Sequence, residues 1–251
     1  MAKISVVVLT KNEEKNIWDC LETVRWADEL IVLDSLSTDR TVAIAQQYTP
    51  RVYQREFKNW PDQRNFALTL ATGDWVFFVD ADERSTPELE AEVRRVTRDR
   101  IPLGWWVPRK NIIFGRWIRH TGWSPDYQLR LFQRKKGRYD TKRLVHELVI
   151  LDGEAGYLKN TLTHLNYDSL GQFRAKQQVY TDHQAQMLKA QGVRPRWQSY
   201  LGQPLREFLR RFFKLEGYKD GFHGLLLSLL MAYYAWLTYR KLGGLWRRAP
   251  L

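Results

Sequence analysis

Four short strand-like segments alternate with helix-like segments over the first hundred residues, and this alternation limits the folds open to the chain. Three of the four are almost continuously apolar, as strands are when helices cover both faces of a parallel sheet. We therefore predict an α/β fold with a mostly parallel, twisted sheet flanked by helices. The predicted strands are Ile4–Thr10, Glu29–Asp34, Arg51–Glu56 and Trp75–Val79.

The segments between these strands carry the signals of helices. Apolar residues recur at helical spacing from 17 to 24, and Pro61–Thr72 begins with Pro and ends before Gly73. Ser85 and Glu88 have the spacing of a capping box, which predicts that a further helix begins after Ser85.

Beyond residue 100 the pattern changes to short alternating segments separated by turns. Leu103–Leu165 is therefore expected to form a mixed or antiparallel extension of the sheet. Asp168–Gly192 then has the pattern of a long polar helix, with Ser169 as its N-cap. The rest of the chain is helical, aromatic and basic.

The basic charge of the chain is concentrated in its last sixty residues. The net charge is +12 over 251 residues, and from Gly192 to Leu251 eleven Lys and Arg face three Asp and Glu, which accounts for +8 of it. Such a segment favours nucleic acid or an anionic membrane surface as a partner. Cys20 is the only cysteine, which excludes an internal disulfide and indicates a reducing, cytoplasmic compartment.

Polar residues follow the first, second and fourth predicted strands at the point where each ends. In an open α/β sheet, ligands bind beyond the carboxyl ends of the strands, where the strand order reverses. Acidic and amide groups at three strand ends indicate a ligand rich in hydroxyl and N–H groups, or a metal ion. These residues are Thr10, Lys11, Asn12, Glu13, Asp34, Ser37, Asp39, Asp80, Asp82 and Glu83.

Asp80 and Asp82 end the fourth strand with one residue between them. Residues i and i+2 of an extended chain point the same way, so the two carboxylates can converge. Two like charges held together are costly unless a cation or a proton intervenes. Mg²⁺ or Mn²⁺ held by carboxylates and substrate phosphates meets this requirement. For Glu83 the simpler interpretation is a residue of a solvated acidic loop that caps the next helix.

Four sequence blocks, in this order, resemble the signature of the family 2 glycosyltransferases, which have the GT-A fold. They are SVVVLTKNEEKNI (5–17), LDSLSTDRTVAIA (33–45), DQRNFAL (62–68) and FVDADER (78–84). The resemblance is closest to the subgroup similar to lipopolysaccharide-core β-1,4-glucosyltransferases, and it covers nearly the whole chain. At Ser35-Leu36 the chain departs from the family, which usually has an acidic residue and Gly there.

The resemblance implies inverting transfer of a hexose from a nucleotide-diphosphate sugar, with a UDP-sugar expected, to a hydroxyl of a lipid-linked or lipopolysaccharide-type glycan. It implies a divalent cation bound mainly by Asp82, with Asp80 near the ribose and the metal. Arg64 would approach the diphosphate, and Asp126 would be the catalytic carboxylate. The residues implied for the nucleoside are Thr10, Asn12, Glu13 and Asp34, the last accepting a hydrogen bond from the base.

The chemistry of glycosyl transfer agrees with these roles. Negative charge builds on the departing diphosphate, where a cation and Arg64 can stabilise it. A single carboxylate can act as general base toward the acceptor hydroxyl, and a single displacement inverts the anomeric centre. Without the resemblance, Asp126 would be interpreted as a turn residue after Pro125. His146 and His164 are candidates for further metal ligands, with a structural role as the alternative.

The tail has the composition of a membrane-associating segment. Gly221–Tyr239 contains no Asp, Glu, Lys or Arg, and its 19 residues approach the length of a transmembrane helix. Its His, three Tyr and one Trp favour the headgroup region instead, and basic residues are interleaved with Phe from 206 to 214. We predict a helical platform on an anionic membrane surface. The alternatives are a helix packed on the catalytic domain and an oligomer contact.

These inferences divide the chain into a GT-A catalytic domain at 1–191 and a helical membrane-associating extension at 192–251. Within the first, 1–100 is the predicted nucleotide-binding half and 101–191 the acceptor and catalytic half. The enzyme is expected to be peripheral on the inner face of the cytoplasmic membrane.

Two other functions remain as alternatives. A nucleotidyltransferase acting on sugar phosphates would be expected to have a Gly-rich basic loop after the first strand, where TKNEEKN stands. A nucleic-acid-binding protein would use the basic tail but leave the acidic strand ends unexplained, so nucleic acid is not the expected partner.

Overall fold

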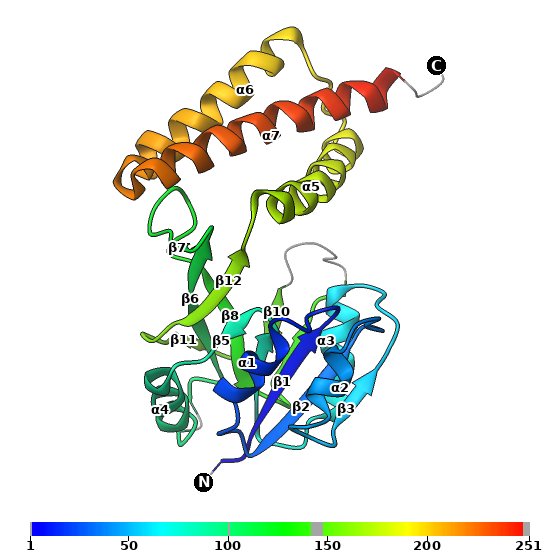
Figure 1. Cartoon of the computed structure of the whole chain (residues 1–251), viewed down its shortest axis with the longest axis vertical. Coiled ribbons are helices and arrows are strands. Elements are labelled where there is room, and N and C mark those ends of the chain that lie inside the picture. The colour runs from blue at the N-terminus through cyan, green and yellow to red at the C-terminus, as the bar shows by residue number, and fades with distance from the viewer. Residues whose placement is uncertain (1, 100, 142–147, 248–251) are drawn as a thin grey trace. The chain divides into compact units, whose positions relative to one another are not determined.

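The computed structural model describes residues 2–99, 101–141 and 148–247, and Figure 1 labels their helices and strands. The chain divides into two compact units. The first comprises Met1–Lys110 with Asp126–His164, and the second comprises Asn111–Pro125 with Leu165–Leu251. The division at residue 191 predicted from the sequence concerns function, and it stays a prediction.

Parallel strands form the centre of the first unit, in the order β3-β2-β1-β4. β1 and β4 are buried along almost their whole length, which explains their continuous apolar sequence. The predicted strands are confirmed, with small changes at the ends of the third and fourth. Their bounds are β1 (Ile4–Thr10), β2 (Glu29–Asp34), β3 (Val52–Gln54) and β4 (Trp75–Asp80).

Helices cover both faces of this sheet because side chains alternate across each strand. Val6 and Val8 of β1 pack in one apolar cluster with residues of α1, α2 and α4. Val7 and Leu9 pack in a second cluster with residues of α3. The predicted α/β architecture is therefore confirmed. The helices are α1 (Ile17–Thr23), α2 (Thr41–Ala45), α3 (Trp60–Leu70) and α4 (Pro87–Val96).

The predicted start of α4 is wrong by one residue. Thr86, not Ser85, is the N-cap, and its side-chain oxygen accepts a hydrogen bond from the backbone N–H of Leu89 at 3.2 Å. Pro87 explains the difference. Proline favours the first helical position, where no N–H is needed, so the residue before it becomes the cap.

The antiparallel extension predicted for the second part of the sheet is present. β8 pairs antiparallel with both β4 and β6, and two-residue β5 pairs antiparallel with β12. β11 pairs with β6, and β9 with β10. The strands are β5 (Glu83–Arg84), β6 (Gly104–Ile113), β7 (Arg116–Trp117), β8 (Tyr127–Gln133), β9 (Gly137–Tyr139), β10 (Val149–Leu151), β11 (Ala155–Tyr157) and β12 (Leu162–Tyr167).

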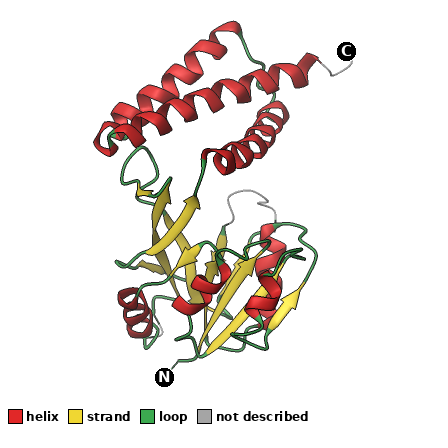
Figure 2. Ribbon diagram, viewed as in Figure 1, coloured by secondary structure: helices red, strands yellow, loops and turns green. Residues whose placement is uncertain are grey.

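The second unit is mainly helical, as the red ribbons of Figure 2 show. α7 packs against both α5 and α6, and its Leu227 and Tyr234 share a buried cluster with Phe173 of α5. Ser169 caps α5 as predicted, accepting from the backbone N–H of Gln172 at 3.2 Å. The helices are α5 (Leu170–Ala190), α6 (Trp197–Leu209), a π-helical turn η1 (Arg210–Lys214), a 3₁₀ turn η2 (Gly217–Asp220) and α7 (Phe222–Arg247).

The turn between α6 and α7 is held by the buried carboxylate of Asp220. It accepts hydrogen bonds from the backbone N–H groups of Arg119 (3.1 Å) and His120 (3.0 Å) and from the hydroxyl of Thr121 (2.9 Å). Gly224 lies so close to this turn that a Cβ there would be 1.8 Å from the carbonyl oxygen of Gly217. Close backbone approach therefore requires glycine at 224.

Candidate active site

The carboxyl ends of β1, β2 and β4 lie side by side at one edge of the sheet. Thr10 is opposite Asp34 in the register of β1 and β2, and Leu9 is opposite Asp80 in that of β1 and β4. The chain runs outward from β1 to β3 and then returns to β4 on the other side of β1. The strand order thus reverses between β1 and β4, which is where open α/β sheets bind ligands.

Asp80, at the end of β4, is paired with two buried arginines. Its Oδ1 accepts from Arg64 Nη2 at 3.0 Å and from Arg130 Nη1 at 3.2 Å, and its Oδ2 pairs with Arg130 Nη2. Burial opposes ionisation of Asp80, but the two guanidinium groups outweigh it and hold the pKa of this carboxyl well below its usual value. Both carboxylate oxygens are therefore already engaged with cationic protein groups.

Asp82 lies beyond β4 and faces a histidine. Its Oδ2 is 3.5 Å from Nε2 of His164, and both side chains are largely buried. His164 belongs to β12, whose pairing with β5 brings it next to the acidic segment. The structure therefore joins two of the predicted metal-binding residues.

A divalent cation fits this pair only with help from a substrate. Among the residues that the structure describes, no three His, Cys, Asp or Glu side chains converge as a metal site. Asp82 and His164 supply one oxygen and one nitrogen donor, whereas Asp80 is held by arginines. A site with few protein ligands suits a divalent cation that completes its coordination shell with waters and substrate phosphate oxygens. His146, the other candidate, lies outside the described residues.

Asp126 immediately precedes β8 and is held by a neighbouring strand. Arg109 of β6 donates to its Oδ2 from Nε at 2.9 Å and is 2.8 Å from it through Nη2, and Gln128 donates to its Oδ1 at 2.9 Å. The backbone N–H of Arg109 also donates to the carbonyl of Asp126, at 2.8 Å. The carboxylate is 21% exposed, so it is fixed in orientation and still accessible.

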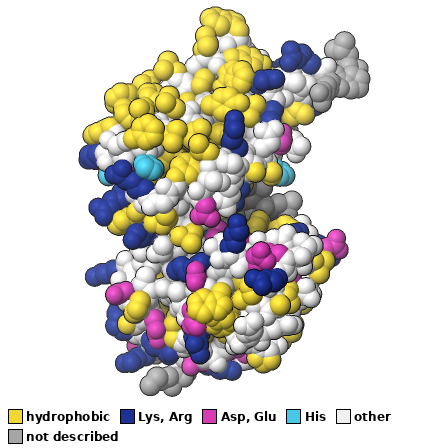
Figure 3. Space-filling view, viewed as in Figure 1, with side chains coloured by type: hydrophobic (Ala, Val, Ile, Leu, Met, Phe, Trp, Pro, Cys, Tyr) yellow, Lys and Arg dark blue, Asp and Glu magenta, His cyan; other side chains and the backbone are white. Residues whose placement is uncertain are grey.

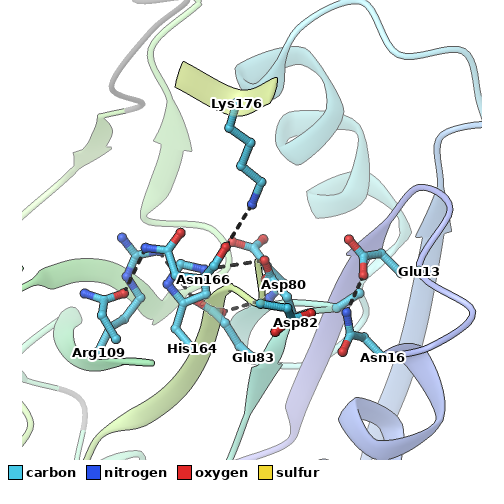
Figure 4. A network of polar contacts seen from close by, with 12 residues as sticks. Glu13, Asn16, Asp80, Asp82, Glu83, Arg109, His164, Asn166 and Lys176 are labelled. Carbon is cyan, nitrogen blue, oxygen red and sulfur yellow. Dashed lines mark hydrogen bonds and ion pairs between the residues drawn. The ribbon is translucent and has the colours of Figure 1, made fainter. Parts of the chain in front are cut away.

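The structure overturns the simple interpretation of Glu83. Its side chain is fully buried and caps no helix. Oε2 accepts from the backbone N–H of Asp80 at 2.9 Å, and Oε1 lies 3.5 Å from Arg109 Nη1 and 3.6 Å from Arg130 Nη2. Figure 4 shows Glu83 among Asp80, Asp82, Arg109 and His164. The antiparallel strands bring in the arginines that neutralise it.

The residues predicted to contact the nucleoside are placed at the ends of β1 and β2, where most are bound to neighbouring loops. Asp34 is fully buried and accepts from the backbone N–H of Ser37 at 2.8 Å, its Oδ1 pairs with the Ser37 hydroxyl, and Leu36 between them has φ +60°. Asn12 accepts from the backbone N–H of Thr38 at 2.8 Å. The turn is therefore formed without the glycine usual in the family.

Glu13 lies in the turn that precedes α1, where its Oε2 accepts from Asn16 Nδ2 at 2.7 Å (Figure 4). By contrast, the buried Thr10 Oγ1 has no hydrogen-bond partner within the described chain, and neither has the buried Gln63 Oε1. Buried polar atoms are normally paired, so two such atoms at one sheet edge are suited to a ligand.

Three residues of this site were not found from the sequence. Arg109 and Arg130 lie in strands predicted only as an extension, and Gln63 is within the DQRNFAL block beside Arg64. The one signal that could have pointed to these arginines was the excess of acidic residues at the strand ends. Buried carboxylates there need cationic side chains from other parts of the chain to balance their charge.

An α/β sheet with carboxylates and guanidinium groups at its switch point is typical of enzymes that bind phosphorylated ligands. The model of the glycosyl transferase family 2 matches residues 5–150, and the chain belongs to this family. It is therefore a glycosyltransferase, and the resemblance inferred from the motifs is confirmed.

Known relatives cover almost the whole chain. It is 30% identical to the lipopolysaccharide core biosynthesis glycosyltransferase LpsC of Rhizobium meliloti (strain 1021), over 95% of this chain and 91% of that protein. It is 29% identical to an uncharacterized glycosyltransferase of Rickettsia bellii (strain RML369-C), over 96% of this chain and 86% of that protein. A solved structure, S. aureus TarS 1–349 in complex with UDP-GlcNAc, is similar with a TM-score of 0.48 and 16% identity, over 98% of this chain and 92% of that chain.

Proposed function

We propose that this enzyme transfers a hexose, with inversion, from a nucleotide-diphosphate sugar to a hydroxyl of a lipid-linked or lipopolysaccharide-type glycan. The observation that carries the proposal is the placement of Asp126. Its carboxylate is oriented by Arg109 and Gln128 and remains partly exposed, in the same unit as the strand ends. LpsC, named for lipopolysaccharide core biosynthesis, supports the choice of acceptor class.

In this proposal a single displacement transfers the sugar. Asp126 accepts the proton of the acceptor hydroxyl while that oxygen bonds to the anomeric carbon. The bond from the anomeric carbon to the diphosphate oxygen breaks, and its electron pair leaves with the diphosphate. A divalent cation supplies Lewis-acid stabilisation of that leaving group when bound.

The remaining site residues bind and orient the donor. Asp82 and His164 would hold the cation together with the donor phosphates, and Arg64, beside Asp80, would face the diphosphate. Thr10 offers to the nucleoside its Oγ1, for which the described residues supply no hydrogen-bond partner. Asn12 and Glu13, after β1, and Asp34, at the end of β2, would complete the nucleoside site beside Thr10.

The alternative enzyme, a nucleotidyltransferase, has no comparable support, because membership of family 2 points to glycosyl transfer. The experiment that separates them is calorimetric titration with UDP, GDP and CDP and their sugars, with and without Mn²⁺, followed by a hydrolysis and transfer assay. We expect metal-dependent binding of one nucleotide and its sugar, a UDP-sugar first. Release of pyrophosphate from a nucleoside triphosphate would contradict the proposal.

We further propose that the second unit docks on the inner face of the cytoplasmic membrane. Among the described residues, no helix is both long enough and apolar enough to cross a bilayer. Instead, no residue of α6 or η1 is buried, and every fourth residue is an exposed apolar side chain. This apolar row is Trp197, Leu201, Leu205, Leu209 and Phe213.

A basic row lies one residue further along the same helix. Arg206, Arg210 and Lys214 are exposed, and neither Arg206 nor Lys214 has an ion-pair partner within the described chain. α7 adds exposed Phe222, Leu229 and Tyr233. Figure 3 shows hydrophobic side chains gathered over α6 and α7 with Lys and Arg beside them. Apolar side chains flanked by unpaired cations are complementary to an anionic bilayer surface.

A further inference from the structure

Glu83 contacts groups from three strands, although it was expected to be a surface residue. Its buried carboxylate is bound through Oε2 to the backbone of Asp80 and faces two arginines through Oε1. Oε1 accepts no hydrogen bond within the described chain, so the two guanidinium groups are what balances its charge. A buried carboxylate persists only with such partners.

Each of these arginines also binds a second carboxylate. Arg130 of β8 pairs with Asp80 through both terminal nitrogens, and Arg109 of β6 holds Asp126 through Nε and Nη2. The charges therefore alternate along a continuous path of five residues. The path runs Asp80, Arg130, Glu83, Arg109 and Asp126.

We propose that Glu83 is a positioning residue, which orients Arg109 and through it the carboxylate of Asp126. Without its negative charge, the guanidinium groups of Arg109 and Arg130 would lose the anion that both of them approach within 3.6 Å. Their repulsion would then displace Arg109, which is 17% exposed, more readily than Arg130, which is 7% exposed.

The same arrangement gives Glu83 a role at the donor end of the site. It also anchors Arg130, which pairs with Asp80, and the buried Nε of Arg130 has no hydrogen-bond partner within the described chain. Asp80 is held by Arg64 and by both terminal nitrogens of Arg130, whereas the guanidinium that binds Asp126 is that of Arg109, which faces Glu83 directly. Loss of Glu83 should therefore impair turnover more than donor binding.

The first test is spectroscopic and needs no substrate. Arg109 Nε–H donates to Asp126, so its NMR signal should exchange slowly with water, and Arg109→Lys assigns it. In Glu83→Gln, which keeps the side-chain shape, we expect this exchange to accelerate at least about tenfold. The matched control is Glu92→Gln, which removes another buried carboxylate, one that binds the backbone of Lys159 and Asn160. Unchanged exchange in a folded Glu83→Gln protein overturns the proposal.

The second test rests on the proposed function. We expect Glu83→Gln to lower kcat about 10-fold to 100-fold with donor affinity within about threefold, and to have little further effect in an Arg109→Gln background. If Glu83→Gln lowered kcat by the same factor in the wild-type and Arg109→Gln backgrounds, the role of Glu83 would be merely structural and the proposal would be overturned. A wild-type enzyme that transfers no sugar contradicts the proposed function instead, while the exchange measurement still decides the role of Glu83. Should Glu83→Gln not fold, Glu83→Asp keeps the charge but shortens the reach, and the same exchange is measured.

Discussion

Arg109 donates from Nε to Oδ2 of Asp126 at 2.9 Å, and its Nη2 forms an ion pair with the same oxygen at 2.8 Å. The other oxygen accepts from Gln128, so the plane of the carboxylate is fixed by contacts on both sides. A general base must hold its lone pair toward the acceptor hydroxyl, and a fixed plane serves that requirement. The contacts of Asp126 thus define how the proposed chemistry can be tested.

Asp126→Asn should nearly abolish transfer while leaving donor binding intact. The amide cannot accept the acceptor proton, so kcat should fall by about 10²-fold to 10⁴-fold. Steady-state kinetics and calorimetric donor titration measure the two effects separately. Asp152→Asn, an exposed acid paired with Lys136, is the control and should behave as wild type. Equal loss of donor binding and turnover in Asp126→Asn would remove Asp126 from the base role.

Asp82→Ala should weaken donor binding chiefly when a divalent cation is present. Asp82 and His164 are the two side chains that we propose to hold the cation, and loss of a ligand lowers metal affinity about tenfold or more. His164→Ala should show the same dependence on metal to a smaller extent. Calorimetry of the nucleotide sugar with Mn²⁺ and with EDTA measures both, and identical metal dependence in all three proteins would contradict the assignment.

Cys20 should be unreactive in the folded protein. Burial, together with the carboxylates of Glu83, Asp82 and Asp80, raises the pKa of its thiol far above its usual value, although Arg84 opposes them. Because Cys20 is the only cysteine, a thiol-specific chromogenic reagent should give no signal in native protein and one equivalent in guanidinium chloride. Rapid native labelling would show that the strand-end region opens readily.

Acid should destabilise the first unit through Glu29. Burial disfavours its charge, but hydrogen bonds from Ser5 and Thr72 and the charge of Arg51 lower its pKa from 4.5 to about 2. The folded-state pKa is below the unfolded one, so this contribution is present above pH 4.5 and is lost as the pH falls toward 2. We expect Glu29→Gln to cost about 3 kcal/mol at neutral pH and progressively less in acid. Urea denaturation of both proteins across this range measures the difference, and a constant difference would contradict the prediction.

Membrane docking should depend on the apolar row of α6. Burying a leucine gains about 1.5–3 kcal/mol, so Leu201→Glu with Leu205→Glu should reduce binding to phosphatidylglycerol vesicles by about tenfold or more. Val179→Glu, at an exposed apolar position of α5, is the matched control. Wild-type binding should also fall in high salt and on phosphatidylcholine alone. Equal binding by all variants would contradict docking through α6, and salt-insensitive self-association lost in the double variant would assign this face to an oligomer contact instead.

The parallel half of the fold was predictable because its signals are local. The apolar run Ile4–Thr10 and the serine before α5 each determine their own element, and the structure has both where they were expected. The last family block contains Asp80 and Asp82, and both lie in the same unit as Asp126, which the resemblance implied as the catalytic carboxylate. The predicted cap at Ser85 was wrong because Ser85 and Thr86 are both suitable N-cap residues. Pro87 occupies the first helical position, so Thr86 is the cap.

The electrostatics of the site could not be predicted in the same way. Glu83 is close to Asp82 in sequence, yet its charge is balanced by Arg109 and Arg130, which are 26 and 47 residues further along the chain. Their proximity depends on the register of β6 and β8, including the irregularity between Trp105 and Trp106. No periodicity in the sequence encodes that register. From the sequence alone, Glu83 therefore resembles a helix cap, although in the structure it lies at the centre of a charge network.

α6 has thirteen residues and packs beside α7, yet none of its residues is buried. Its outer side chains can therefore be exchanged with little cost to the fold. On our proposal these side chains determine which lipid surface the enzyme meets, while the strand ends determine what it catalyses. The two properties could then be engineered separately: one transferase could be retargeted to a bilayer of different charge by rewriting a single helix face.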